Sequence, residues 1–214
     1  MKINCIILAR YGSFRVPKKN LRPFKNKPLI YWTLKQSLRI KRITSIILSS
    51  DSKKIIDIAK KISKKIIINK RPSRISGKKT RSETVIKYLH KIYSFDLNDY
   101  ILILQPTSPL RKDSDINNTI SIALKYNLKC LHSGNYYKKK IKIKKKIILY
   151  NNKRRKLFYN KKNYSYNGAI YFFKLSYFIK NKTIYEKLPN IYKMNNKNSL
   201  DIDTFVDLKI LNSI

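Results

Sequence analysis

The sequence predicts an α/β protein with a Rossmann-like three-layer α/β/α fold, a mainly parallel sheet and a small protruding arm. Three short apolar runs, at residues 6–8, 46–48 and 66–68, alternate with two longer segments whose apolar residues recur at helical spacing. A β-α-β-α-β order of this kind requires parallel strands joined by right-handed crossovers. The chain has 214 residues, 43% of them hydrophobic, so it can bury one good core, and we expect residues 1–214 to form a single domain.

The first crossover begins with Ile6-Ile7-Leu8, an uninterrupted apolar run typical of an inner parallel strand covered on both faces. A helix is expected from Pro28 to Lys41, with Pro28 as its first residue because proline is tolerated at that position. Residues 46–48 form the second expected strand. Ser50 or Asp51 is then expected to cap the second helix.

The second crossover returns to a strand at residues 66–68, followed by a polar loop from Arg71 to Lys79. The sequence Thr80-Arg81-Ser82-Glu83 has capping-box spacing and predicts the start of a third helix. Residues 100–104 form the clearest inner strand, and the loop Q-P-T-S-P-L-R after it contains two prolines that make it rigid. Ligands of open α/β sheets bind at the carboxyl ends of such strands.

The rest of the chain predicts a helix capped by Asp113, strands near residues 130–133 and 167–173, and a terminal helix after Thr204. Residues 136–163 differ in character because Ile141 and Ile143 alternate with lysines, which suggests a strand or hairpin with one apolar face. This inserted segment is expected to be an arm that packs on a second subunit, a basic flap over an anionic site, or a solvated lysine run.

The formal net charge of +39 invites a nucleic-acid-binding interpretation. The lysines are spread over almost every segment together with many Ile, Asn and Tyr residues, so biased composition explains the charge better, and only nonspecific nucleic-acid binding is expected. The sequence lacks an apolar run long enough to span a membrane and a secretory signal, so we expect no membrane association and a cytoplasmic location. Cys5 and Cys130 are expected to be buried core thiols.

The loop after the first strand combines cations with residues that allow a tight turn. Arg10, Arg15, Lys18 and Lys19 lie within ten residues, Gly12 permits a sharp bend and Ser13 offers a hydroxyl; a polyanion such as a nucleoside triphosphate would fit there. A solvated basic loop is the alternative. The loop matches neither the Walker A pattern nor the G-x-G-x-x-G turn of dinucleotide-binding proteins.

Two carboxylates near the end of the chain predict a metal site. Asp201 and Asp203 are two residues apart, so in an extended segment their side chains point the same way. Mg²⁺ usually takes one or two carboxylates together with phosphate oxygens and water. The alternative is that Asp203 or Thr204 only caps the terminal helix.

Five segments resemble motifs of the acylneuraminate cytidylyltransferases, the CMP-sialic acid synthetase family, in the family's order: A-R-Y-G-S-F-R-V-P-K-K-N-L, S-S-D-S-K-K-I, L-Q-P-T-S-P-L-R, N-G-A-I-Y and D-I-D-T-x-x-D-L. Together they span most of the chain except residues 136–163. Gln105 points to the acylneuraminate branch, since the related ketodeoxyoctulosonate enzymes usually have Asp there. The resemblance implies a nucleotidyltransferase fold, cytoplasmic homodimers, and transfer of CMP from CTP to a 2-keto-3-deoxy nonulosonic acid with Mg²⁺ as cofactor and pyrophosphate as product.

The resemblance also implies roles for particular residues. Arg10, Lys19 and Asp203 would act in catalysis, and Asp201 and Asp203 would bind Mg²⁺. The substrates would be bound by the remaining motif residues: Ser13, Arg15, Asn20, Arg71, Ser82, Gln105 and Asn167. The triphosphate would contact Arg10, Ser13, Arg15 and Lys19, the cytidine would contact Asn20, Arg71 and Ser82, and Gln105 would contact the acceptor sugar or the ribose.

The sequence departs from the family pattern at several positions. Tyr11 replaces a small residue in the first loop, and Lys79 and Arg81 flank Thr80 where the family tends to have D-T-A. Arg154 and Arg155 are candidates for the sugar carboxylate, although the proline expected after them is missing. Sialate, legionaminate and pseudaminate are therefore all open as acceptors, and a decayed enzyme or a basic nucleic-acid-binding protein are the alternative interpretations.

Overall fold

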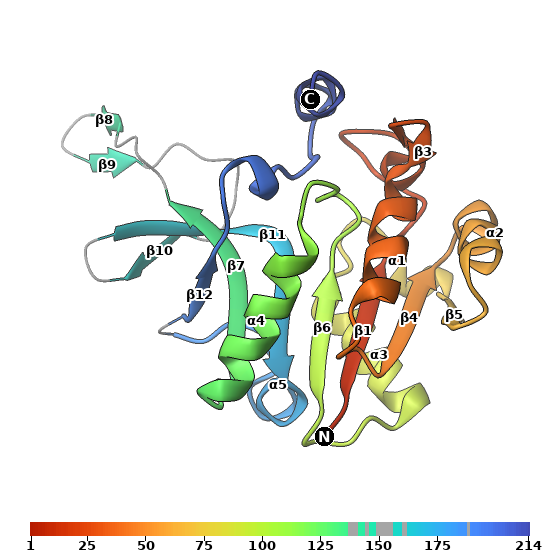
Figure 1. Cartoon of the computed structure of the whole chain (residues 1–214), viewed down its shortest axis with the longest axis horizontal. Coiled ribbons are helices and arrows are strands. Elements are labelled where there is room, and N and C mark those ends of the chain that lie inside the picture. Colours follow the sequence, from red (N-terminus) through yellow and green to blue (C-terminus); the bar gives the residue numbers. More distant parts are fainter. Residues whose placement is uncertain (137–140, 144–145, 149–155, 160–161, 188) are drawn as a thin grey trace.

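The computed structural model describes residues 1–136, 141–143, 146–148, 156–159, 162–187 and 189–214, and for residues 136–164 it describes no side chains. Its centre is an eight-stranded sheet in the order β12-β7-β11-β6-β1-β4-β5, with β10 paired to β11 (Figure 1). In this sheet β11 pairs antiparallel with both β6 and β7, while β1, β4, β5 and β6 are mutually parallel and β12 is parallel to β7. The predicted mainly parallel α/β fold is therefore confirmed.

The strands and helices follow one another much as the sequence predicts. The strands are β1 (Ile3–Leu8), β2 (Pro23–Phe24), β3 (Lys27–Pro28), β4 (Ser45–Ser50), β5 (Ile66–Lys70), β6 (Tyr100–Leu104), β7 (Cys130–Tyr136), β8 (Ile141–Ile143), β9 (Lys146–Ile148), β10 (Lys156–Tyr159), β11 (Lys162–Lys174) and β12 (Ile191–Lys193). The α-helices are α1 (Leu29–Arg39), α2 (Lys53–Ile62), α3 (Ser82–Tyr93), α4 (Asp113–Lys125), α5 (Leu175–Asn181) and α6 (Phe205–Asn212). Short 3₁₀ helices are η1 (Lys19–Leu21), η2 (Ser73–Ile75) and η3 (Lys197–Ser199).

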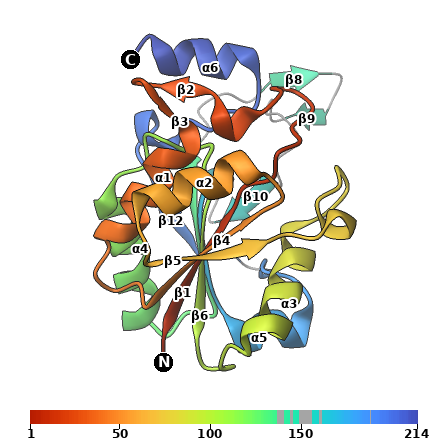
Figure 2. The same ribbon diagram turned by 90° about the vertical axis from the view of Figure 1, so that its right-hand side faces the viewer.

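Two hydrophobic layers cover the sheet. Because successive side chains of a strand point to opposite faces, Ile7 of β1 packs with α1, α2 and α4, whereas Ile6 packs with α3 and α5. Figure 2 shows α3 and α5 on one side of the sheet and α4 on the other. The expected three-layer arrangement follows directly from this alternation.

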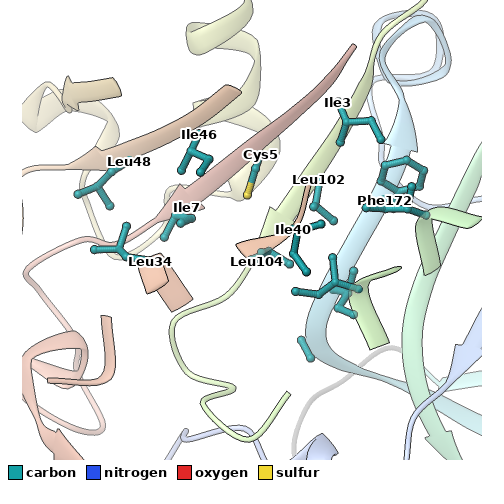
Figure 3. Packing of buried hydrophobic residues seen from close by; sticks show 14 of the residues in the cluster. Ile3, Cys5, Ile7, Leu34, Ile40, Ile46, Leu48, Leu102, Leu104 and Phe172 are labelled. Atoms are coloured by element: carbon teal, nitrogen blue, oxygen red, sulfur yellow. The ribbon is translucent and has the colours of Figure 1, made fainter. Parts of the chain in front are cut away.

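The larger layer holds the apolar side chains of the inner strands. Cys5, Leu48, Leu102 and Phe172, from four neighbouring strands, are all fully buried and pack close together (Figure 3). Burial raises the pKa of the Cys5 thiol to about 12, so Cys5 behaves as a small apolar core residue, as expected. Cys130 is also a buried free thiol.

A third hydrophobic cluster fixes the terminal helix to the rest of the fold. Leu211 of α6 and Ile202 just before it are buried against Phe24 and Leu29. Thr204 is the N-cap of α6 and forms a capping box with Asp207. This cluster holds the 201–203 segment beside the start of the chain.

The expected helix starts are displaced by one or two residues. Pro28 is the N-cap of α1 and not its first helical residue, because its extended backbone (ψ 149°) precedes the helix. Ser52, not Ser50 or Asp51, caps α2 by accepting a hydrogen bond from Ile55 N. The N-caps of α3 and α4 are Arg81 and Lys112, so the predicted capping roles of Thr80 and Asp113 are wrong.

The inserted 136–163 segment is only partly described. β8 and β9 pair with each other, and β10 pairs with β11 at the edge of the main sheet. The predictions for this segment, an arm against a second subunit, a basic flap or a solvated lysine run, depend on side chains outside the described residues. The same holds for Arg154 and Arg155 as candidates for binding the sugar carboxylate. In the described part of the chain, none of the helices combines the length and the apolar composition that a membrane crossing needs.

Candidate functional site

A pocket of about 270 Å³ opens at the carboxyl ends of the parallel strands. The chain runs from β1 to β4 on one side and later returns to β6 on the other, so the strand order reverses between β1 and β6. Leu8 of β1 and Ile103 of β6 line the pocket together with Val85 of α3. This is the topological switch point where open α/β sheets bind ligands.

The basic loop after β1 forms one wall of the pocket. Arg10, Ser13 and Arg15 all line it, and the loop is held in place by hydrogen bonds at both ends. Asn20 donates to the carbonyl oxygen of Arg10 at 2.9 Å, and Tyr11 N donates to Asp51 Oδ1 at 2.6 Å. The predicted anion-binding loop is thus a fixed structure that faces the pocket.

Cations from this loop meet a carboxylate from the end of the chain. Lys19 Nζ lies 3.1 Å from Asp203 Oδ1, and Arg15 Nη2 lies 3.0 Å from Asp203 Oδ2. Lys19 also donates to the carbonyl oxygen of Ile202 at 2.6 Å. Residues 184 positions apart in the sequence therefore share one site.

Asp201, the residue before Ile202, contacts the loop that follows β6. Thr107 donates a hydrogen bond to Asp201, and Ile202 N donates to the carbonyl oxygen of Thr107 at 2.8 Å. Gly168 has φ +80°, and a Cβ at this position would lie 3.4 Å from Asp201 Oδ2 and 3.8 Å from Gln105 Oε1. The missing side chain leaves space beside these two oxygens.

The donor atoms at this place fit a magnesium ion. Asp201 and Asp203 offer carboxylate oxygens and Gln105 offers an amide oxygen, the ligand type that Mg²⁺ prefers, and Mg²⁺ completes its shell with phosphate oxygens and water. Among the residues that the structure describes, three or more His, Cys, Asp or Glu side chains nowhere gather as a metal cluster. The carboxylates of Asp201 and Asp203 suit the predicted magnesium site, which stays a prediction.

The other end of the pocket contains Arg71 and the start of α3. Arg71 is only 6% exposed; its Nη2 donates to the carbonyl oxygen of Ser49 at 2.7 Å and its Nε donates to Ser49 Oγ at 3.1 Å. Burial lowers the pKa of Arg71 to about 10, so the guanidinium still carries its charge at neutral pH. Ser82, the first residue of α3, lines the pocket nearby.

Most of the predicted site residues converge on this pocket. Those that line it are Arg10, Ser13, Arg15, Lys19, Asn20, Arg71, Ser82 and Gln105. Asp201 and Asp203 reach its edge through Thr107 and through Lys19 and Arg15. Their functional roles stay predictions.

Asn167 has a different position. It is fully buried, its Oδ1 accepts from Ser133 Oγ at 2.6 Å, and its Nδ2 donates to Ser199 Oγ at 3.0 Å. It does not belong to the residues that line the pocket. This geometry favours a role in joining β7, β11 and the segment before Asp201, and its predicted contact with substrate stays a prediction.

Some lining residues were not predicted from the sequence. Leu8, Val85 and Ile103 form an apolar wall, but in the sequence they are indistinguishable from core residues. Thr107 lies within a motif that was recognised, without a role being assigned to it. Arg81, noted as a departure from the family, adds a further cation to the lining, whereas Tyr11 and Lys79 are exposed and outside it.

Comparisons with known proteins agree with this geometry. The sequence profile of the cytidylyltransferase family matches residues 4–210. The chain is 32% identical to a CMP-N,N'-diacetyllegionaminic acid synthase of Legionella pneumophila, covering 97% of this chain and 93% of that protein. It is 29% identical to an N-acylneuraminate cytidylyltransferase of Escherichia coli, covering 98% of this chain and 51% of that protein.

The fold is similar to that of a solved structure, a CMP:2-keto-3-deoxy-manno-octonic acid synthetase in complex with CTP. The TM-score is 0.70, the identity 14%, and the match covers 100% of this chain and 98% of the other. At this identity the likeness concerns the fold alone. It supports the three-layer architecture described above.

Proposed function

Because this chain belongs to the cytidylyltransferase family, we propose that it transfers CMP from CTP to a 2-keto-3-deoxy nonulosonic acid and releases pyrophosphate. The observation that carries the proposal is the contact of Arg15 and Lys19 with Asp203 at the rim of one pocket. A triphosphate needs cations, and a metal that accompanies it needs carboxylates close to those cations. Both types of group meet here.

In this reaction the anomeric hydroxyl oxygen of the acceptor forms a bond to the α-phosphorus of CTP. The bond between the α-phosphorus and the oxygen bridging to the β-phosphate breaks, pyrophosphate leaves, and the hydroxyl proton passes to solvent. Since no covalent enzyme intermediate is required, the protein acts by positioning and by electrostatic stabilisation. Arg10, Arg15 and Lys19 stabilise the negative charge that grows on the leaving pyrophosphate.

The remaining pocket residues hold the two substrates. Arg71, Ser82 and Asn20 bind the cytidine side, where the apolar side chains of Leu8, Val85 and Ile103 exclude water. Ser13 binds a phosphate oxygen. Gln105, at the end of β6 and beside Asp201, binds the acceptor sugar or the ribose.

Asp201 and Asp203 would hold Mg²⁺. Bound there, the ion would neutralise negative charge on the phosphates and help to align the α-phosphorus for in-line attack. Asp201 and Asp203 both contribute negative charge to this site, and Thr107 keeps the Asp201 carboxylate in place through its hydrogen bond.

The acceptor is proposed to be a nonulosonic acid of the legionaminic or sialic type, since the two similar proteins described above are a CMP-N,N'-diacetyllegionaminic acid synthase and an N-acylneuraminate cytidylyltransferase. Pseudaminic acid is the third sugar to be tested. A homodimer and a cytoplasmic location stay predictions, which analytical ultracentrifugation and cell fractionation would test.

The decisive experiment incubates the purified protein with CTP, Mg²⁺ and each of the three nonulosonic acids, and follows pyrophosphate release and CMP-sugar formation. Replacing CTP by UTP, and omitting the acceptor, are the controls. Stoichiometric formation of pyrophosphate and a CMP-sugar is expected with at least one acceptor. No release with any of the three would contradict the proposal, and tight salt-sensitive RNA binding without turnover would favour the nucleic-acid-binding alternative.

A further inference from the structure

The sequence S-S-D-S, Ser49 to Ser52, lies at the carboxyl end of β4 and has no role in the proposed reaction. It forms contacts in several directions. Ser52 caps α2, and Asp51 accepts a hydrogen bond from the backbone of the basic loop at Tyr11 N. Ser49 and Ser50 face the second polar loop, because the carbonyl oxygen of Ser50 accepts from Arg71 N at 2.8 Å. The segment therefore lies between the two loops that form the pocket.

Ser49 makes a defined set of hydrogen bonds and is fully buried. Its hydroxyl accepts from Arg71 Nε at 3.1 Å and donates to Asn69 Oδ1 at 3.0 Å. One hydroxyl group has a single proton to donate, so these two bonds are compatible only in this direction. A buried polar chain thus runs from Asn69 of β5 through Ser49 of β4 to Arg71.

These hydrogen bonds can fix the orientation of Arg71, because the guanidinium is planar and its N–H donors have a fixed geometry. Nε and Nη2 form one edge, and both bind Ser49. Nη1 is on the edge turned away from Ser49, and among the described residues it has no hydrogen-bond acceptor. Within the described part of the chain, no carboxylate lies within ion-pair distance of Arg71. Its orientation therefore depends on neutral partners.

We propose that Ser49 and Asn69 are positioning residues that hold Arg71 in a binding-competent orientation before the nucleotide arrives. This inference rests on the proposed function, in which Arg71 binds the cytidine side of CTP. A donor that is already oriented loses less conformational entropy on binding. Without Ser49 Oγ, Arg71 Nε and Asn69 Oδ1 would lose their partner in a buried place, and the side chain would rotate to find another.

The test measures CTP affinity by calorimetry without acceptor sugar, so turnover is not needed. We expect Ser49→Ala to raise the Kd for CTP about tenfold, the loss of one hydrogen bond to a charged group, while kcat at saturating CTP changes less than about twofold. The matched control is Ser45→Ala, in the same strand but at its other end, where the hydroxyl donates to Asn4 Oδ1 at 2.6 Å. Ser45→Ala should lower the midpoint temperature of thermal unfolding without changing the Kd for CTP.

A double-mutant cycle separates positioning from a general structural effect. In an Arg71→Lys background, Ser49→Ala should change the Kd for CTP by less than about twofold, because the fork that Ser49 orients is absent. Asn69→Ala serves as the second variant if Ser49→Ala does not fold, and it should raise the Kd less than Ser49→Ala does.

The inference is overturned if folded Ser49→Ala binds CTP as tightly as the native protein, or if it weakens binding equally in the Arg71→Lys background. Failure of the proposed function looks different. A native protein that binds CTP but forms no CMP-sugar contradicts the proposed function and leaves the affinities of the variants to decide this inference. A native protein that binds no nucleoside triphosphate overturns both.

Discussion

The two ends of the pocket hold their cations in opposite ways. At the proposed cytidine end, Arg71 is 6% exposed and is bound by the hydroxyl and carbonyl groups of Ser49. At the proposed phosphate end, the side chain of Arg15 is 51% exposed and Arg15 and Lys19 are both paired with Asp203. Arg71 is thus held in place by neutral groups of the protein, whereas the charges of Arg15 and Lys19 are already balanced by a carboxylate of the protein.

Under the proposed function, this difference implies that the phosphate end would exchange partners on binding. A triphosphate would attract Arg15 and Lys19, and a metal ion would attract Asp203, so contacts with the ligands would replace the internal ion pairs. Partly exposed ion pairs are worth about 1 kcal/mol or less, so the exchange costs little. Arg71 would undergo no comparable exchange, since Nε and Nη2 bind Ser49 and Nη1 lies on the other edge of the guanidinium.

The largest expected effect concerns the carboxylate that both cations share. Asp203→Asn should lower kcat/KM about a thousandfold, because a charged magnesium ligand becomes a weaker neutral one. CTP affinity measured without Mg²⁺ should not fall, since Arg15 and Lys19 lose a competitor for the phosphates. Asp57→Asn, on the exposed side of α2, is the control for loss of one negative charge. Unchanged turnover in Asp203→Asn would remove this residue from the site.

The proposed cytidine end should be the next most sensitive. Arg71→Lys is expected to weaken CTP binding about thirtyfold, because a lysine cannot bind Ser49 through two donors and also reach the ligand. The measurement is calorimetric titration with CTP. Arg74→Lys, in η2 of the same loop and exposed, should bind CTP like the native protein. Equal affinities of all three proteins would mean that the cytidine end is not where the nucleotide binds.

A smaller effect is expected for Lys19→Ala. It should raise the KM for CTP about tenfold and slow turnover, because one cation at the phosphates is lost. The effect should be smaller than that of Arg71→Lys, since part of the Lys19 charge already compensates Asp203 in the free protein. Steady-state kinetics check this, with the exposed Lys35→Ala in α1 as the control. A KM equal to that of the native protein would exclude a phosphate contact.

The smallest expected effect is a change in the salt dependence of CTP affinity, which should differ between variants at the two ends of the pocket. Exposed charges are screened more than buried ones, so Arg15→Gln should make CTP affinity about twofold less sensitive to a rise from 50 to 200 mM NaCl. Arg71→Lys should leave the salt sensitivity as it is in the native protein. Titrations at the two salt concentrations provide the test. If the CTP affinity of Arg15→Gln responds to salt as that of the native protein does, Arg15 does not make an exposed contact with the nucleotide.

Much of the fold could be predicted because several inner strands contain short, uninterrupted apolar runs. Ile6-Ile7-Leu8 and residues 100–104 leave no alternative to inner strands. The helix caps could not be resolved in the same way, because the expected caps Ser50 and Asp51 are followed directly by Ser52, another possible cap, and the backbone geometry decides among them. The position of β11 between β6 and β7 depends on long-range pairing that a local pattern does not contain.

The site was predictable to the extent that its residues have charge. Arg15, Lys19 and Asp203 stand out as anion and metal ligands, and the structure brings them together. The ion pairing between them was not predicted, because it depends on distances between the two ends of the chain. Ser49 lies in the segment S-S-D-S-K-K-I that resembles the family, but the sequence assigns it no role of its own. Only its contact with Arg71 reveals a role.

The link between Lys19 and Asp203 spans 184 positions, and this has a consequence for biosynthesis. A ribosome adds the carboxylate that meets the basic loop 184 residues after Lys19. The nascent chain therefore cannot complete the site until Asp203 has been made and Leu211 has packed against Phe24 and Leu29. A chain that terminates before residue 203 would lack the carboxylate that pairs with Lys19 and Arg15.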